Sequence, residues 1–266
     1  MKSTIYFALL NWFVLSACVQ SKKNQEDRFD QLFSGNLTII DLTYTLNQKN
    51  PHWPGSDTSP FIYDTLAAHK SGAPAMGAYR TPEHFGTHLD APAHFADGQP
   101  SVDQLAVSDL FGPAVVVNVV EKCTENPDYV LTRQDLEVWE SEYGEIPEGA
   151  IVLMQTGWGE KWNDMKAYRN MDSSGKMHFP GFSAEAARFL IDVRNISGIG
   201  IDNLSVDAGA ADGFPAHDIV NGAGKYHLEN VADLNLLPPV GAFLIVAPIK
   251  LEGGSGGQVR IFAVLP

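Results

Sequence analysis

Basic residues are scarce in this sequence. Its 266 residues include 18 Lys and Arg against 32 Asp and Glu, which gives a formal net charge of -14. The acidic residues are dispersed rather than grouped in blocks, so they predict a solvated acidic surface. Such a surface disfavours nucleic acids and anionic membranes as partners, and no basic patch with interleaved aromatic residues offsets it.

One familiar catalytic motif is missing, and another lacks the structural context that it needs. The sequence has no Gly-x-x-x-x-Gly-Lys phosphate-binding loop. The glycine-rich segment 253–257 lacks the strand-to-helix context of a nucleotide-binding loop or of a serine hydrolase's nucleophile turn. We therefore predict that this segment is a flexible turn.

No apolar run near the N-terminus is long enough to span a bilayer comfortably. Residues 5–17 are largely apolar and follow Lys2, a pattern typical of an export signal. The sequence Leu15-Ser16-Ala17-Cys18 resembles a bacterial lipobox, which implies cleavage before Cys18 and acylation of that cysteine. The predicted product is an exported lipoprotein of the bacterial cell envelope, facing the periplasm or the surface. A simple signal peptide and an uncleaved anchor remain alternatives.

Three segments follow from this interpretation. Residues 1–17 are the predicted signal peptide, residues 18–36 are the lipidated cysteine with a polar, flexible tether, and residues 37–266 are one domain. One domain is preferred because no Pro/Ser-rich linker divides the sequence after residue 37. Cys123 is then the only cysteine of the mature domain, so no disulfide can form within it.

The domain has more predicted strands than helices. Capping residues Thr132 and Ser183 predict helices over 132–143 and 183–193. The mixed order, without regular alternation of strand and helix, predicts an α+β or layered β/β/α domain. The predicted strands are β-rich or continuously apolar segments, at 37–44, 61–68, 114–120, 151–155, 199–202, 240–248 and 259–265.

Residues 84–94 place three histidines and one aspartate in a short stretch with no cysteine near. In an extended backbone, side chains alternate between faces, so His84, His88 and Asp90 can project to one side. The glycine and prolines in and beside this stretch argue against a helix. Neutral imidazole nitrogens with a carboxylate oxygen suit a borderline-hard divalent ion such as Zn²⁺ or Mn²⁺.

The run has the pattern His-x-Gly-Thr-His-x-Asp-x-Pro-x-His. This pattern resembles the signature of the metal-dependent cyclase/hydrolase family, which includes kynurenine formamidase, isatin hydrolase and trans-dienelactone hydrolase. The resemblance covers about residues 37–266 and implies the swivelling β/β/α fold and a homo-oligomer. Other matching segments are Trp53-Pro54-Gly55, Gln155-Thr156-Gly157-Trp158, Pro180-Gly181-Phe182-Ser183 and residues 200–207.

The resemblance also implies a metal site for one or two ions. His84 and His88 would serve one metal, and Asp90 could bridge two. His217 and Glu229, which have the family's twelve-residue separation, would complete the second position. His227 is an open alternative to His217, because it would share a strand face with Glu229.

The remaining site residues are assigned by the same resemblance. His94 would act as the general acid/base that shuttles a proton, with a fourth metal ligand as the alternative. Trp53 would line the pocket and contact an aromatic ligand. His178 precedes a predicted helix N-terminus and could line the pocket, although an ordinary loop role fits it equally well.

The predicted activity is metal-dependent hydrolysis of small amides, cyclic amides or esters, with metal-activated water as nucleophile. Arylformamidase chemistry on N-formylkynurenine is the family's commonest label, and isatin-type or lactone ring opening is the near alternative. An exported enzyme would meet environmental or envelope substrates, which weakens the formamidase assignment. The alternative from another class is a non-catalytic lipoprotein that binds a metal or a solute.

Overall fold

The computed structural model describes residues 37–55, 61–70 and 72–265. The compact unit Ile40–Val264 contains the candidate site. The predicted signal peptide, lipobox and tether lie outside the described residues. Among the residues that are described, no helix has both the length and the apolar character needed to cross a membrane.

Seven strands pair into a closed, barrel-like sheet. Their order is β12-β11-β5-β7-β9-β10-β4, and the ring closes because β4 also pairs with β12. Strands β5, β7, β9 and β10 run parallel, while β4, β11 and β12 join them antiparallel. The bounds are β4 (His88–Asp90), β5 (Phe111–Asn118), β7 (Ile151–Gln155), β9 (Gly198–Ile201), β10 (Tyr226–Glu229), β11 (Phe243–Pro248) and β12 (Gly256–Val264), with β1 (Ile39–Asp41) beyond β12.

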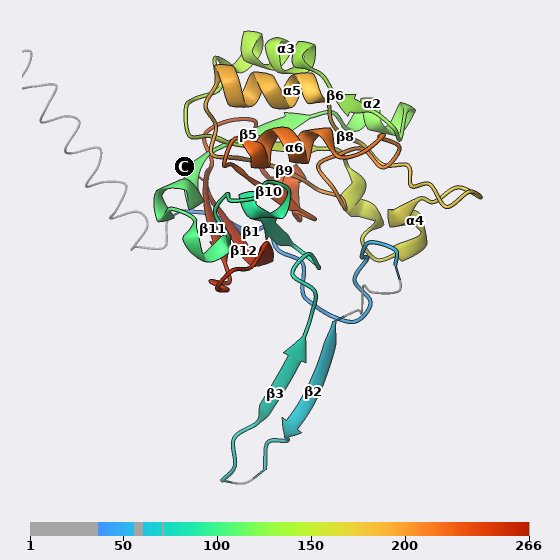
Figure 1. Ribbon diagram of the computed structural model, residues 1–266, viewed down its shortest axis with the longest axis vertical. Helices are drawn as coiled ribbons and strands as arrows, with labels where there is room; N and C mark the ends of the chain where they lie inside the picture. Colours follow the sequence, from blue (N-terminus) through green and yellow to red (C-terminus); the bar gives the residue numbers. More distant parts are fainter. Residues whose placement is uncertain (1–36, 56–60, 71, 266) are drawn as a thin grey trace, which may run out of the picture. The chain divides into compact units, whose positions relative to one another are not determined.

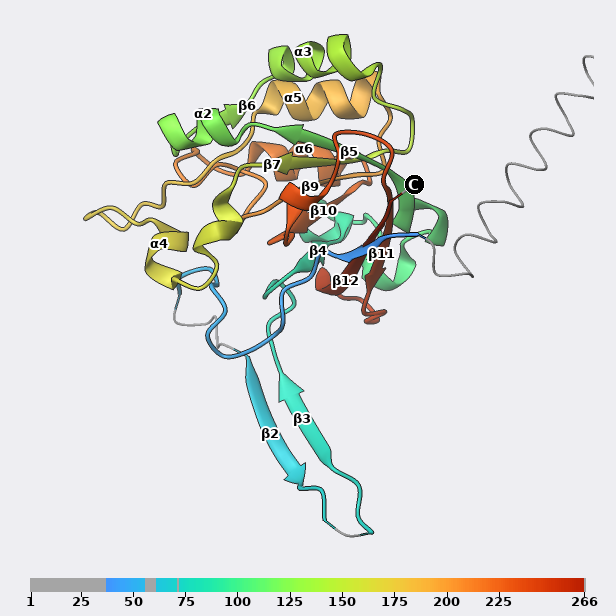
Figure 2. The same cartoon turned by 180° about the vertical axis from the view of Figure 1, so that it is seen from behind.

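Helices gather on one side of this sheet, where α3, α5 and α6 lie over it in both views (Figures 1 and 2). The predicted helix starts are confirmed: Thr132 and Asp135 form a reciprocal cap, and the Ser183 hydroxyl accepts from Ala186 N. The helices are α2 (Val120–Glu125), α3 (Arg133–Tyr143), α4 (Met165–Arg169), α5 (Ala184–Arg188) and α6 (Pro215–Gly222). Shorter turns are η1 (Pro92–His94), η2 (Val102–Gln104), η3 (Val107–Leu110), η4 (Trp158–Lys161), π-helical η5 (Phe189–Val193) and η6 (Leu234–Leu236).

The main apolar core fills the space between the sheet and these helices. Strands β5 and β7 are buried on both faces, which explains their continuously apolar sequences. Burial of this surface holds the strand ends, and therefore the site, in a fixed register. The core includes Val115, Val117, Val152 and Met154 from the sheet with Leu136, Trp139, Ala186, Ala187, Ala216 and Val220 from the helices.

Two smaller pairings complete the fold. Strands β2 (Ile62–Ala67) and β3 (Met76–Arg80) form a separate hairpin, and β6 (Val130–Leu131) pairs with β8 (Gly181–Phe182). The mixed α+β class is confirmed. The layered β/β/α expectation is not specifically shown, because the main strands close into one sheet rather than forming two stacked ones.

Candidate metal centre and adjoining cavity

Antiparallel pairing of β4 with β10 builds the heart of the site. Asp90 lies directly opposite His227, and His88 lies opposite Glu229. Residues two apart on a strand share a face, so all four side chains project to the same side. All four are buried, with at most 5% of their surface exposed. A short ladder thus removes two carboxylates and two imidazoles from water together.

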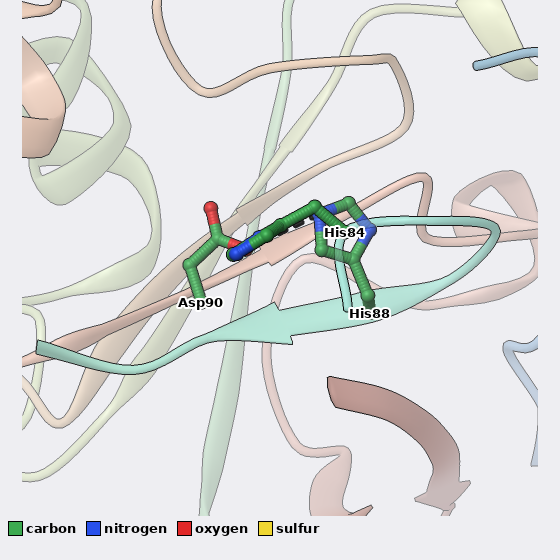
Figure 3. Close-up of side chains that lie close together, drawn as sticks. All are labelled: His84, His88 and Asp90. Carbon is green, nitrogen blue, oxygen red and sulfur yellow. Dashed lines mark hydrogen bonds and ion pairs between the residues drawn. The ribbon is translucent and has the colours of Figure 1, made fainter. Parts of the chain in front are cut away.

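His84 reaches the same place by a different route. It lies before β4, and Gly86 turns the chain with φ of +69°, so the expected extended backbone does not continue through residues 84–87. A Cβ on Gly86 would lie 2.6 Å from a Leu46 methyl carbon, so glycine is required there for space as well as conformation. The turn brings His84 back onto the strand, and Figure 3 shows its ring directed at Asp90 beside His88.

The carboxylates of Asp90 and Glu229 both lie between the imidazoles of His88 and His217. On one side, His88 Nε2 is 3.2 Å from Asp90 Oδ1 and 3.4 Å from Glu229 Oε2. On the other, His217 Nε2 from α6 is 3.4 Å from Asp90 Oδ2 and 3.4 Å from Glu229 Oε1. The structure therefore brings the distant pair His217 and Glu229 to the sequence signature, as the resemblance implies.

Hydrogen bonds at the far side of two rings fix which nitrogen faces the carboxylates. His88 Nδ1 lies 2.9 Å from the Gly86 carbonyl oxygen, an acceptor, so this nitrogen carries the proton. His217 Nδ1 likewise lies 2.7 Å from Asp207 Oδ2. When a metal ion replaces the second proton of each ring, Nε2 is left with a lone pair directed at the space beside Asp90 and Glu229, as in metal-binding histidines generally.

A hydrogen-bond relay orients His84 in the same way. The Ser255 hydroxyl donates to Glu83 Oε2 at 2.6 Å, so its oxygen accepts from His84 Nε2 at 3.0 Å. His84 Nδ1 is left facing Asp90 Oδ1 at 2.6 Å, where two acceptors need a shared proton or cation between them. A Cβ on Gly256 would lie 2.5 Å from His84 Cε1, so glycine makes room for this ring.

These residues fit a divalent cation. His88 Nε2 is buried without a hydrogen-bond partner although it lies among charged oxygens. Ligand atoms about 2.0–2.2 Å from a tetrahedral ion lie roughly 3.3–3.6 Å apart. The contacts of 3.2 to 3.4 Å made by His88 and His217 match that spacing. The 2.6 Å contact between His84 and Asp90 is a hydrogen-bond distance and would have to lengthen around an ion.

The electrostatics of the centre favour positive charge. Burial alone would raise the pKa of Asp90, but His84 and His88 hold it well below its usual value. Burial and Asp90 would also raise the pKa of Glu229, yet the adjacent imidazoles of His217 and His88 lower it to about 2. Burial would lower the pKa of His88, whereas the two carboxylates raise it to about 10. The ionised carboxylates therefore require protons or a cation beside them.

His94 lies beside the centre on η1. Its ring stacks on His84 with centroids 3.9 Å apart and planes at 24°. Neither of the two ligand groups among the described residues, His84-His88-Asp90 and Asp90-His217-His227, includes it. Burial lowers the pKa of His94 to about 4, so its imidazole is neutral at pH 7 and can accept a proton.

A cavity of about 370 Å³ opens onto these groups. Trp53 lines it and lies with its ring centroid 6.1 Å from that of Phe214. His178 does not line it: its Nδ1 lies 2.8 Å from an Asp128 oxygen, and Asp172 approaches its other nitrogen. The structure therefore places His178 outside the lining of this cavity. The other apolar lining residues are Pro51, Pro82, Phe85, Phe95 and Leu204.

Three residues that orient the histidines were not singled out from the sequence. Asp207 lies in a segment that matches the family, but no role was predicted for it. Ser255 falls in the glycine-rich segment read as a flexible turn, whereas Gly256 and Gly257 in fact begin β12. Glu83 carries no signal beyond its position next to His84.

Comparisons with known proteins point the same way. The family model described as "Putative cyclase" matches residues 40–208. An isatin hydrolase from Roseibium aggregatum is 33% identical over 251 residues, covering 89% of this chain and 95% of that protein. A kynurenine formamidase from Salinibacter ruber is 24% identical over 231 residues, covering 84% and 96%. The solved structure of isatin hydrolase A from Ralstonia solanacearum superposes with a TM-score of 0.84 at 36% identity, covering 91% and 97%.

Proposed function

Since this chain belongs to the putative cyclase family and is a metal-dependent hydrolase, we propose that it hydrolyses the carbon–nitrogen bond of small aromatic amides. Isatin-like cyclic amides are the first candidates, because the isatin hydrolases are 31% to 37% identical to this chain. N-formylkynurenine is the second candidate, supported by formamidases at 24% to 29% identity. Lactone ring opening is the third.

The observation that carries this proposal is the common orientation of three histidines. His84, His88 and His217 each have one ring nitrogen held by a hydrogen bond and the other aimed at a buried carboxylate. These rings, with Asp90 and Glu229, would hold one or two divalent ions. Imidazole and carboxylate ligands fit Zn²⁺ or Mn²⁺.

A bound ion would supply Lewis acidity, which polarises a carbonyl and lowers the pKa of a water beside it. His94 is the proton carrier of the proposal. Its neutral ring stacks on His84 and lines the cavity, so it can accept a proton as water attacks and return it to the leaving nitrogen. Asp207 and Ser255 keep the histidine rings in place while this happens.

The cavity favours a flat aromatic substrate. Trp53, Phe95 and Phe214 are aromatic residues that line its wall together with the imidazoles and carboxylates of the metal centre. Aromatic rings bind one another through stacked or edge-to-face contacts. Trp53 is 36% exposed, so it can meet a ligand that enters from solvent.

We further propose a homo-oligomer and an exported lipoprotein. The β2–β3 hairpin supports the first, because its Tyr63, Leu66 and Tyr79 are 56%, 65% and 57% exposed and an isolated hairpin is only marginally stable. The pattern of residues 1–18 supports cleavage and acylation of Cys18. The swivelling β/β/α assignment is also a proposal, supported by the helices on one side of the sheet.

Metal analysis followed by a substrate panel tests the activity. The purified protein should contain a divalent metal and hydrolyse isatin faster than N-formylkynurenine or a lactone, and chelation should abolish turnover. Turnover that is fully preserved in metal-stripped protein would overturn the proposed mechanism. A preference for N-formylkynurenine over isatin would reverse the order of the substrates.

A further inference from the structure

His227 is the one histidine of the centre that has no hydrogen bond at either ring nitrogen. It is 0% exposed, and both Nδ1 and Nε2 are buried without a partner. Burying a polar ring in this state destabilises a fold, so such a residue calls for an explanation such as a water or an ion. The sequence pattern offered His227 only as a substitute for His217.

The position of His227 is set by the sheet and not by a flexible loop. It lies within β10, directly opposite Asp90. The centroid of its ring is 4.6 Å from that of the His217 ring, and the two ring planes make an angle of 78°. Its Nδ1 is 3.8 Å from Asp90 Oδ2, which is too far for a hydrogen bond. One ligand atom each from Asp90, His217 and His227 all lie within 4.8 Å of one another.

We propose that His227 is a further ligand of the second cation position, for which the family resemblance already implies His217 and a shared Asp90. The proposal rests on the metal ligands proposed above and adds one to them. Asp90 Oδ1 faces His84 and His88, while Oδ2 faces His217 and His227. Each oxygen of one carboxylate thus serves one pair of imidazoles, which gives two cation positions of similar composition.

Glu229 alone is a weaker partner for His217 at this second position. Its Oε1, the oxygen that faces His217, already accepts a hydrogen bond from Val206 N at 3.0 Å. The imidazole of His227 would supply a ligand atom in place of the Glu229 oxygen that Val206 N already shares, and a neutral imidazole adds no charge. His227 therefore completes the second cation position, where the Glu229 carboxylate also accepts a backbone hydrogen bond.

The test counts ions with and without the His227 ring. His227→Leu removes both nitrogens at similar volume, and His69→Leu is the matched control at an exposed histidine outside the centre. Each metal-stripped protein is titrated with Mn²⁺ and with Zn²⁺ by calorimetry, and its content is measured after equilibrium dialysis. The wild type and His69→Leu should bind two ions, whereas His227→Leu should keep one and lose affinity for the other at least ~100-fold.

Thermal unfolding separates a ligand from a packing residue. Without metal, His227→Leu should unfold at the wild-type temperature or above it, because leucine leaves no buried nitrogen unpaired. With metal, its stabilisation should be smaller than that of the wild type. If His227→Leu fails to fold, His227→Gln carries the same titration.

Two unaltered binding steps in the His227 variant would overturn the proposal and indicate a buried water as the partner of this ring. A single step in the wild type would overturn it as well. Both results leave the proposed hydrolase intact, since at least one ion would still bind. Failure of the wild type to bind any divalent ion would instead overturn the proposed function.

Discussion

Two cavities of this molecule differ in size and in chemistry. The larger, about 840 Å³, is lined by Asn118, Gln155 and Asp202 at the carboxyl ends of β5, β7 and β9. Open α/β sheets commonly bind ligands at such strand ends. The smaller, about 370 Å³, contains the imidazole and carboxylate cluster. Size and position alone would therefore favour the larger cavity, although the candidate metal ligands lie in the smaller one.

The difference lies in whether the buried polar atoms have partners. In the larger cavity, the Asp202 carboxylate accepts hydrogen bonds from Thr156 N at 3.0 Å and Gly157 N at 2.9 Å. In the smaller, the buried Nε2 of His88 has none, and behind it both ring nitrogens of His227 have none either. Satisfied groups hold a fold together, whereas unsatisfied groups aimed at one point predict a ligand.

The largest expected effect on activity is at Asp90 in the smaller cavity, with Asp202 in the larger cavity as its comparison. Asp90→Asn should lower kcat/KM at least about 10⁴-fold, equivalent to about 5.5 kcal/mol, because it removes the carboxylate shared by the ligand groups. Its metal content should fall as well. Asp202→Asn should lower the unfolding temperature but keep metal and turnover per folded molecule. Loss of metal from the Asp202 variant would break the distinction between the cavities.

His94→Ala should have the next largest effect. We expect kcat to fall about 10³-fold, within the usual range for general acid–base groups, with nearly unchanged metal content. Steady-state kinetics and elemental analysis of one preparation measure both. Equal loss of activity and metal would instead make His94 a ligand.

The hydrogen-bond relay from Glu83 to His84 predicts a smaller change. Ser255→Ala should weaken metal binding about 10- to 100-fold, because His84 loses the acceptor that fixes its ring. Ser255→Thr keeps the hydroxyl and should restore part of the affinity. Ser174→Ala, at an exposed loop, is the control, and an equal loss there would exclude a specific role for Ser255.

Trp53 in the smaller cavity and Trp162 in the larger one test which cavity binds the substrate. Trp53→Leu should raise KM for an aromatic substrate about tenfold, or about 1.4 kcal/mol, with little change in kcat. Trp162 lines the larger cavity and stacks on Tyr44 at 3.9 Å. Trp162→Leu should lower stability while KM stays the same, and a raised KM there would place substrate in the larger cavity.

The smallest effect is expected at Cys123. Burial raises the pKa of its thiol to about 12, so little thiolate exists at pH 8. In a Cys18→Ser protein, a thiol reagent at pH 8 should react slowly with the native state and quickly after unfolding. Rapid reaction of the native protein would show that this region opens.

Local sequence patterns predict part of the site. His88 and Asp90 share a strand face as their spacing indicates, and the resemblance identifies His217 and Glu229. The roles of Asp207 and Ser255 could not be predicted, because they depend on contacts between segments far apart in the chain. The closure of β4 onto β12 is a non-local pairing of the same kind.

The choice between His217 and His227 shows why register matters. The sequence places His227 and Glu229 on one strand face, but only the pairing of β4 with β10 puts His227 opposite Asp90. His178 shows the reverse case, because Asp128 and Asp172 hold its ring outside the cavity. The same fold therefore brings His217 and His227 to the centre and keeps His178, which lies nearer to the signature in the sequence, outside the cavity.

A crystal structure of metal-loaded protein, with anomalous diffraction measured at the absorption edge of the metal, tests the central claim most directly. The account predicts an anomalous peak about 2.0–2.2 Å from an Asp90 oxygen and from His88 Nε2, beside the smaller cavity. No peak at Asp90, or a peak confined to the larger cavity near Asp202, would contradict it.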